Sequence, residues 1–235
     1  MPSLPTILLT AVSIFGAGTS AVGLMRRDSW GPAVSLGPTS SYLVNCTTTI
    51  LPGKMPPQEA VDGQLYLWPG ISNGTGDLIQ SIIGSYPTDN SWCGATGEQW
   101  CASSELFNGT QTGGTKHAGV LGTHKIQISY VLESESTWTW HQKMYDLTDD
   151  VLLAEYTTND GPMTGWGTAV ECNDNCTMPT EPHYYYDTVL HLKAADPDFK
   201  DTLGASNGAT YESFTTPDEG KTWYLGTITI PVMSS

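Results

Sequence analysis

Basic residues are scarce in this sequence. Its 235 residues contain 9 Lys and Arg against 24 Asp and Glu, which gives a formal net charge of −15. Binding to nucleic-acid phosphates, or to an anionic membrane surface, depends on clustered Lys and Arg. The composition therefore argues against a nucleic-acid partner and against a membrane-surface function.

Long apolar runs are also missing, apart from a short one at the amino terminus. The segment 4–15 is predominantly apolar, and small residues follow it up to Ala21. This pattern is typical of a signal peptide, because a membrane-spanning helix needs about 20 apolar residues. We predict a signal peptide over 1–21 and a short propeptide over 22–27 that ends at the dibasic pair Arg26-Arg27. The protein is then expected to be secreted, with a mature chain over 28–235 that contains no arginine.

Only five cysteines are present, and four of them form two close pairs. In the oxidising environment of a secreted protein, such pairs are expected to form disulfides, here Cys93 with Cys101 and Cys172 with Cys176. Cys46 is left over, and we predict a buried free thiol. Export is also in keeping with four glycosylation sequons, which are expected on surface turns if they are modified: Asn45, Asn73, Asn108 and Asn175.

Common catalytic and cofactor motifs are absent. The sequence has no Gly-rich phosphate loop, no His-Glu-x-x-His and no Gly-x-Ser-x-Gly. Its five histidines show no metal-ligand spacing, so we expect neither a metal nor a cofactor. Glu133 and Glu135 would face the same side of a strand, as a glycosidase pair could, but we favour a solvated turn there.

The rest of the chain is predicted to form mainly β-strands. Ile126, Ile128 and Tyr130 alternate with polar residues, which predicts a half-buried strand and, with Trp138 and Trp140, a hairpin over 124–144. Further strands are predicted at 42–50, 64–68, 77–83, 151–156, 168–171, 185–193 and 223–231, and one short helical turn within 194–202. Many short strands separated by Gly, Pro, Asn and Asp indicate an all-β sandwich or jelly roll. We therefore predict one domain over 28–235, acting as a monomer.

Two polar residues lie within otherwise apolar strands. Gln80 follows Leu78-Ile79, and Glu171 ends the run Ala169-Val170. A buried Gln or Glu must be hydrogen-bonded or used in function, because burying it without a partner is costly. The alternative is that both are edge residues that face water.

Four short motifs resemble those of the fungal glutamic peptidases (eqolisins). They are, in chain order, Asp28-Ser29-Trp30-Gly31-Pro32-Ala33, Trp68-Pro69-Gly70-Ile71, Leu78-Ile79-Gln80 and Ala169-Val170-Glu171. The resemblance covers most of the mature chain. It implies a concanavalin A-like β-sandwich of two antiparallel sheets and a secreted, acid-active peptidase that acts on polypeptides. Two departures are that Ile82 stands where the family usually has glycine, and that Trp166 and Gly167 stand where the family has Ala and Glu.

The resemblance also implies site residues. Gln80 and Glu171 match the family's catalytic Gln and Glu, and Trp30 and Trp68 match tryptophans of its cleft. We add Trp166, which precedes Glu171 in the same strand, as a third substrate-binding candidate. In this hypothesis, Glu171 takes a proton from a water that attacks the peptide carbonyl, and Gln80 stabilises the oxyanion.

Two other functions remain open. The first is a carbohydrate-active sandwich, a polysaccharide lyase or glycoside hydrolase, in which exposed tryptophans stack on sugar rings, because one fold serves many functions. The second is a secreted homologue that has kept the sandwich and lost the activity.

Overall fold

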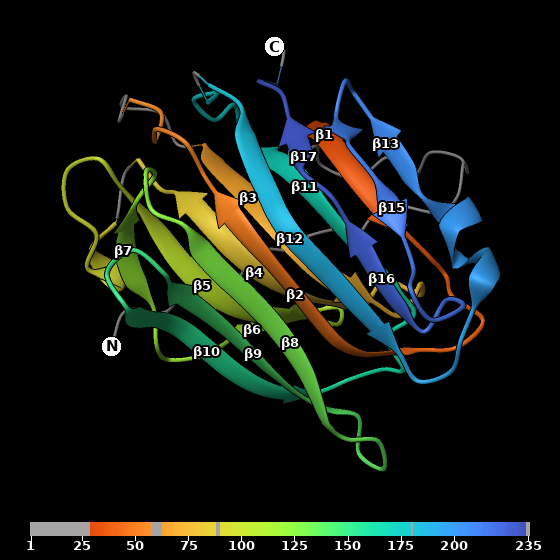
Figure 1. Cartoon of the computed structure of the whole chain (residues 1–235). Coiled ribbons are helices and arrows are strands. Elements are labelled where there is room, and N and C mark those ends of the chain that lie inside the picture. Colours follow the sequence, from red (N-terminus) through yellow and green to blue (C-terminus); the bar gives the residue numbers. More distant parts are fainter. Residues whose placement is uncertain (1–28, 58–62, 88–89, 180, 234–235) are drawn as a thin grey trace, which may run out of the picture.

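The structure, a computed structural model, describes residues 29–57, 63–87, 90–179 and 181–233. The predicted signal peptide and propeptide, and Asp28 of the first motif, lie outside the described residues. The described chain forms two antiparallel β-sheets that pack as layers, one in front of the other in Figure 1. The predicted β-sandwich is confirmed.

The first sheet, called sheet A, carries the sequence-based site candidates. Its strands, in spatial order, are β13 (Gly204–Ser206), β1 (Ser29–Leu36), β11 (Gly165–Asn173), β3 (Gln64–Ser72), β4 (Leu78–Ser85), β5 (Gln99–Phe107) and β6 (Gln111–Gly113), with β7 (Ala118–Leu121) also paired to β5. Every pairing is antiparallel, so residues directly opposite each other point to the same face.

The second sheet, sheet B, forms the other layer. Its strands are β10 (Val151–Asn159), β9 (Thr139–Asp146), β8 (Ile126–Ser134), β2 (Leu43–Leu51), β12 (His183–Leu192), β16 (Thr222–Leu225) and β15 (Phe214–Thr215), with β17 (Ile228–Ile230) joining β12 to β14 (Thr210–Tyr211). Two short 3-10 helices, η1 (Ser91–Cys93) and η2 (Pro197–Thr202), complete the described secondary structure. The second of them matches the predicted helical turn.

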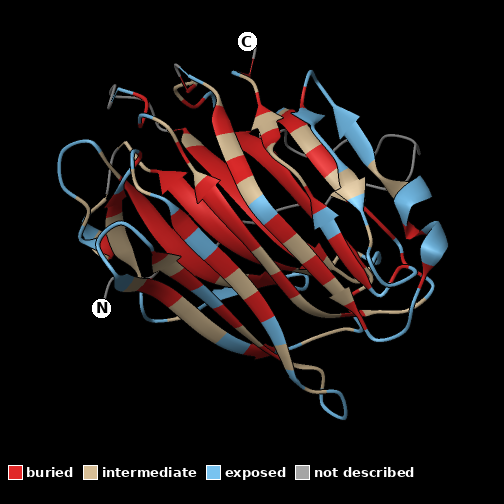
Figure 2. Cartoon of the chain, viewed as in Figure 1, coloured by how far each residue is buried: buried red, intermediate tan, exposed pale blue. Residues whose placement is uncertain are grey.

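The main core lies between the two sheets. It collects residues of one parity along strands without a register shift, such as Leu65 and Leu67 from β3 and Ile126 and Ile128 from β8. In β8 the intervening residues are exposed or half-buried, which explains the alternation in the sequence. Strands β3, β4 and β11 are instead buried along nearly their whole length, as the rear sheet in Figure 2 shows. Both faces of sheet A are therefore lined by buried side chains.

The two predicted disulfides are present. Cys93 pairs with Cys101 and Cys172 pairs with Cys176, and Cys46 is a buried free cysteine. The cysteine predictions are thus confirmed. The Cys172–Cys176 disulfide closes a short loop immediately after Glu171, at the end of β11.

Candidate active site

A second, smaller apolar cluster lies on the face of sheet A that is opposite to the main core. We call this the outer face. Its buried members are Tyr66, Trp68, Ile82 and Ala169, which have the parity opposite to the core residues of the same strands. Gln80 lies two residues before Ile82 and Glu171 two residues after Ala169, so both share the outer face. Both are 2% exposed, so the alternative of edge residues facing water is wrong.

Gln80 and Glu171 are not neighbours on that face. Strand β3 lies between their strands, and Gln80 pairs with Gly70 whereas Glu171 pairs with Tyr66. In a flat ideal sheet, with strands about 4.8 Å apart and a rise of about 3.4 Å per residue, a separation of two strands and four residues corresponds to about 17 Å between the two Cα atoms. The structure brings both residues to one face but does not set them side by side.

The residue directly opposite Gln80 is Glu105 of β5. The two side chains point to the same face from adjacent strands. Together with Gly70, Gly167 and Gly113, which continue the pairing on either side, they form one row across the sheet. Glu105 is the only carboxylate in this row. Sequence reasoning missed it, because no local pattern relates positions 80 and 105.

The carboxylate of Glu105 is held at both oxygens. Ser103 Oγ donates to Oε1 over 2.5 Å, and Gln111 Nε2 donates to Oε2. Burial raises the pKa of Glu105, and the hydrogen bonds from Ser103 and Gln111 and the nearby His117 only partly oppose this rise. The result is a positioned carboxyl group that protonates more readily than an ordinary glutamate.

Tyr86 lies within the electrostatic reach of both glutamates. Burial, then Tyr66 and the charges of Glu105 and Glu171, raise the pKa of Tyr86 well above its ordinary value. Tyr86 also continues a series of ring contacts, with centroids 5.6 Å from Tyr66 and 5.1 Å from Trp92. Trp92 in turn lies 4.9 Å from the His117 ring. Aromatic rings therefore extend from β3, near Glu171, to His117, near Glu105.

The tryptophan candidates divide between the two faces. Trp30 and Trp68 lie together on the outer face, with ring centroids 6.1 Å apart in an edge-to-face contact. Trp68 is buried, and its indole Nε1 has no hydrogen-bond partner within the described structure. Buried N–H groups are nearly always paired, so this donor is suited to a ligand or a water.

Trp166 lies elsewhere. It belongs to the main core between the sheets and is 2% exposed. It is five positions from Glu171 in β11, and an odd spacing in a strand places two side chains on opposite faces. Its position does not support the prediction that Trp166 binds substrate on the same face as Glu171.

Buried polar groups support the row from the core side. Gln142 of β9 is fully buried, and its Nε2 donates to the Glu105 backbone oxygen over 3.0 Å. Its Oε1 accepts a 3.4 Å hydrogen bond from Ser81, which is adjacent to Gln80. Tyr130 of β8 donates to the Pro69 carbonyl over 2.8 Å, next to Gly70. Sheet B therefore ties β3, β4 and β5 together directly beneath the row.

One group of side chains away from this face has the composition of a metal site. His124 Nδ1 lies 2.7 Å from Asp146 Oδ2 and 3.8 Å from Asp149 Oδ2. His124 precedes β8, Asp146 ends β9, and Asp149 lies in the turn between β9 and β10. Asp146 also accepts the backbone N–H groups of Thr148 and Asp149. These hydrogen bonds explain the cluster as a turn that Asp146 stabilises.

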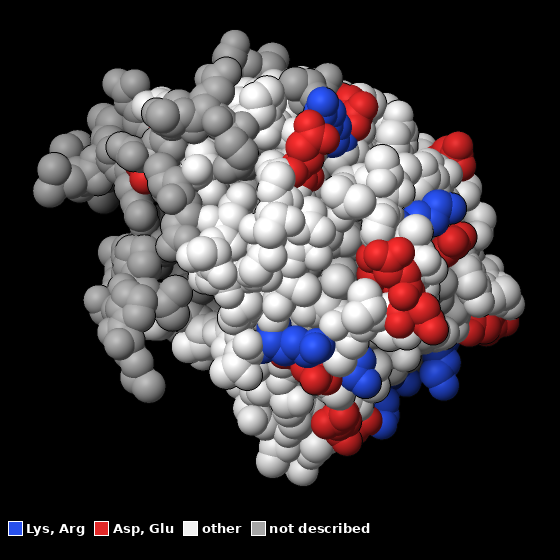
Figure 3. Space-filling model, turned by 90° about the vertical axis from the view of Figure 1, so that its left-hand side faces the viewer, with Lys and Arg blue, Asp and Glu red and all other residues white. Residues whose placement is uncertain are grey.

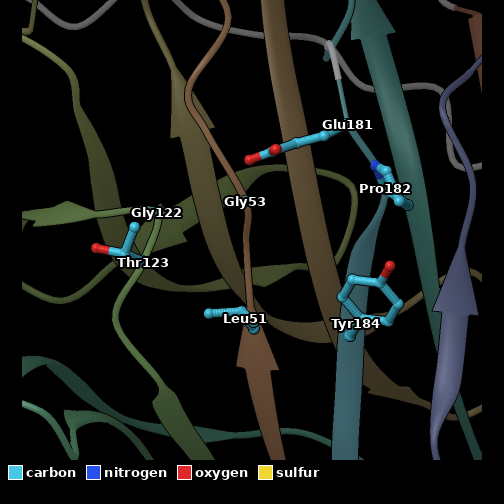
Figure 4. A pocket seen from close by; sticks show the side chains of 7 residues that line it. All are labelled: Leu51, Gly53, Gly122, Thr123, Glu181, Pro182 and Tyr184. Carbon is cyan, nitrogen blue, oxygen red and sulfur yellow. The ribbon is translucent and has the colours of Figure 1, made fainter.

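A separate pocket lies at the ends of β2 and β12, shown in Figure 4. Its lining consists mostly of apolar side chains and glycines: Leu51, Gly53, Gly122, Thr123, Glu181, Pro182 and Tyr184. The one carboxylate among them, Glu181, accepts the backbone N–H of Lys54. This pocket contains none of the sequence-based candidates.

The charged residues show no basic surface on the side of the molecule seen in Figure 3. Lys side chains there lie in small groups with Asp and Glu, among the residues that are coloured. Within the described residues, no helix is long and apolar enough to cross a membrane.

Comparison with known proteins shows which solved structures share the fold of this chain. No family model matches the chain, and no curated protein matches it. Two solved structures that resemble it are crystal structures of scytalido-glutamic peptidase, one with a transition state analog inhibitor and one with a peptide based transition state analog. The first is 14% identical, with a TM-score of 0.55, and covers 86% of this chain and 99% of its own. The second is 13% identical, with a TM-score of 0.51 and the same coverage.

This chain has the fold of a glutamic peptidase. At such low identity the likeness shows the fold alone, and the resemblance that the sequence motifs indicated is confirmed at that level. The roles of Gln80, Glu171, Trp30 and Trp68 stay predictions.

Proposed function

We propose that the chain is a secreted, acid-active endopeptidase whose reaction takes place on the outer face of sheet A. The observation that carries the proposal is the buried carboxamide of Gln80, which shares that face with two glutamates and with the Trp30–Trp68 pair. The fold shared with scytalido-glutamic peptidase supports the same reaction class, because that protein is a peptidase crystallised with transition state analogs.

The chemistry requires one amide and one carboxylate. An ionised glutamate takes a proton from a bound water as the water oxygen attacks the peptide carbonyl carbon. The N–H of Gln80 donates to the carbonyl oxygen as that oxygen becomes negative. The carbon–nitrogen bond then breaks, and the protonated glutamate gives its proton to the leaving amine. The products are a carboxylic acid and an amine, and the glutamate is regenerated.

The acidic working range follows from the same group. A carboxyl that acts as base and then as acid works best near its own pKa, and carboxyl groups titrate in acid. The low content of basic residues agrees with this range, because few positive charges are left to repel one another once the carboxylates are protonated.

The test is digestion of a denatured protein by the full chain, secreted from a eukaryotic host. It is run from about pH 2 to about pH 7, with pepstatin present and beside Gln80→Ala. We expect cleavage in acid that resists pepstatin and is lost in the variant. If the folded protein cleaves no peptide at any pH, the proposal fails, and a panel of polysaccharides tests the carbohydrate-active alternative.

A further inference from the structure

We propose that an ordered water molecule is bound inside the sandwich, between the hydroxyl groups of Thr168 in sheet A and Tyr185 in sheet B. The ligand is water itself, and it joins the two sheets beneath the strand that carries Glu171. This inference concerns the interior of the fold, so it does not depend on the proposed peptidase function.

The first reason is that both hydroxyl groups are buried without a regular partner. Thr168 of β11 is 2% exposed and Tyr185 of β12 is 0% exposed. Neither oxygen has a hydrogen-bond partner of ordinary geometry among the described residues. Burying a hydroxyl group without a hydrogen bond is costly, and buried polar atoms are nearly always paired with protein or with ordered water. Two such atoms in the interior therefore indicate a bound polar molecule.

The second reason is that the two groups lie close together although they belong to different sheets. Thr168 points to the main core, because it is adjacent in β11 to Ala169, which lies on the outer face. Tyr185 belongs to the main core. Burial raises the pKa of the Tyr185 hydroxyl, and the nearby Thr168 hydroxyl partly opposes this rise. One water molecule can therefore contact both groups.

The third reason is the polar character of this part of the core. Sheet A carries two small polar side chains on its core side here, Ser81 in β4 and Thr168 in β11. Gln142 of sheet B accepts a hydrogen bond from Ser81 over 3.4 Å. Tyr130 of sheet B donates to the carbonyl of Pro69, which lies directly opposite Thr168. The surroundings of Thr168 are therefore polar, as the site of a buried water must be.

Trp166 is the candidate for a third hydrogen bond. It lies two residues before Thr168 in β11, so both side chains point to the core. Its indole Nε1 is also buried without a hydrogen-bond partner within the described part of the chain. A buried water typically makes about three hydrogen bonds. Two hydroxyl groups and one N–H group would supply that number.

The water extends to β11 the support that sheet B gives to β3, β4 and β5. Gly167, which directly precedes Thr168, is the member of β11 in the row that contains Gln80. A link from Thr168 to Tyr185 therefore fixes β11 from the side opposite to the proposed reaction face. In this assignment both sheets are joined beneath the whole row by hydrogen bonds.

The direct experiment is a high-resolution crystal structure of the secreted protein. We expect a peak of electron density about 2.5–3.0 Å from both Thr168 Oγ1 and Tyr185 Oη, the usual length of a hydrogen bond between hydroxyl groups. A direct hydrogen bond between the two side chains would overturn the proposal. So would the absence of a peak between them in a map that shows other buried waters.

Thermal unfolding of Thr168→Val and Tyr185→Phe tests the same site in solution. Each variant keeps the size of the side chain and removes one hydroxyl group. If a water joins the two groups, each single variant removes one of its hydrogen bonds, and we expect Tm to fall by about 2–4 °C. The double variant should lose less than the sum of the two losses, because both groups bind the same molecule. Thr157→Val, at an exposed position of β10, is the control and should leave Tm nearly unchanged.

The sign of the change in Tm distinguishes a bound water from a dry core. A hydroxyl group without a partner in a dry interior carries a desolvation cost, so its removal would raise Tm. A rise in Tm in both single variants would therefore overturn the proposal. Two losses of Tm that simply add in the double variant would also overturn it, because they would show that the two groups do not share a ligand.

Discussion

Gln80 and Glu105 face each other across adjacent strands, while Glu171 lies beyond β3 on the same sheet face. This relationship is set by pairing register. A shift of one residue in β5 would turn the Glu105 side chain into the core. The observed register is stabilised by the hydrogen bond from Gln142 to the Glu105 backbone carbonyl. The outer face therefore has one glutamate directly opposite Gln80 and a second one beyond β3.

Gly113→Ala tests the packing of the Glu105 side chain. The added Cβ would lie 3.3 Å from Glu105 Cγ and 3.3 Å from the Ser104 oxygen, which is tight enough to displace the carboxylate. Because Glu105 lies opposite Gln80 and small misplacements close to reacting groups are costly, we expect kcat/KM to fall by about tenfold with little change in Tm. Gly204→Ala is the control, since its Cβ meets nothing nearer than Ser35 Oγ at 3.8 Å. Equal activity of both variants would contradict a role for Glu105 orientation.

The sequence predicts some strands well for a physical reason. Strand β8 faces the core on one side and solvent on the other, so its apolar residues alternate and the pattern is visible. Strand β5 is buried on both faces over most of its length and has no such alternation. It was not predicted, and with it Glu105 was missed. The single predicted strand over 223–231 is likewise two strands, β16 and β17.

The site was predictable in part. Gln80 stands out because a polar residue in an apolar strand is unusual, and Trp166 could have been placed in the core from its odd spacing to Glu171. Which strands are adjacent in sheet A could not be read from local patterns. Strands β11 and β3 are adjacent although they lie about a hundred positions apart, whereas β3, β4 and β5 follow one another in the chain. Distances between candidates depend on that order.

Gln142→Leu tests the support beneath the row. Leucine fills a similar volume but removes the donor to the Glu105 carbonyl and the acceptor for Ser81. A buried acceptor that loses its partner costs about 1–3 kcal/mol, so we expect the free energy of unfolding in urea to fall by that amount. Gln127→Leu, at an exposed position of β8, should change it by less than about 0.5 kcal/mol. Equal losses of unfolding free energy in the two variants would show that the hydrogen bonds of Gln142 do not stabilise the fold.

Cys46 gives a direct check on the cysteine arrangement. It is 0% exposed, and burial raises the pKa of its thiol. A thiol that is neither exposed nor ionised does not react with a disulfide reagent. We therefore expect no reactive thiol in the native protein and one after denaturation without reductant. Three or five thiols in the denatured protein would show that one or both disulfides are absent.

Asp196 is expected to carry part of the stability in acid. It is 6% exposed, and its Oδ2 accepts from Thr39 Oγ1 at 2.6 Å and from the Ser40 backbone N–H at 2.7 Å, which ties the loop before β2 to the segment before η2. Burial by itself would raise the pKa of Asp196, but these hydrogen bonds outweigh it and hold the pKa below its ordinary value.

The sign of the pH effect follows from that lowered pKa. A group whose folded-state pKa lies below its unfolded-state pKa stabilises the fold above the unfolded-state value, and this contribution is lost as pH falls through the folded-state pKa. We expect Asp196→Asn to lower the free energy of unfolding by about 1.5–3 kcal/mol near neutral pH, the range for hydrogen bonds to a charged group. The difference from wild type should shrink progressively in acid. Asp201→Asn, an exposed position in η2, is the control and should stay near wild type at every pH. A difference for Asp196→Asn that grows as the pH falls would contradict the lowered pKa and the role assigned to its hydrogen bonds.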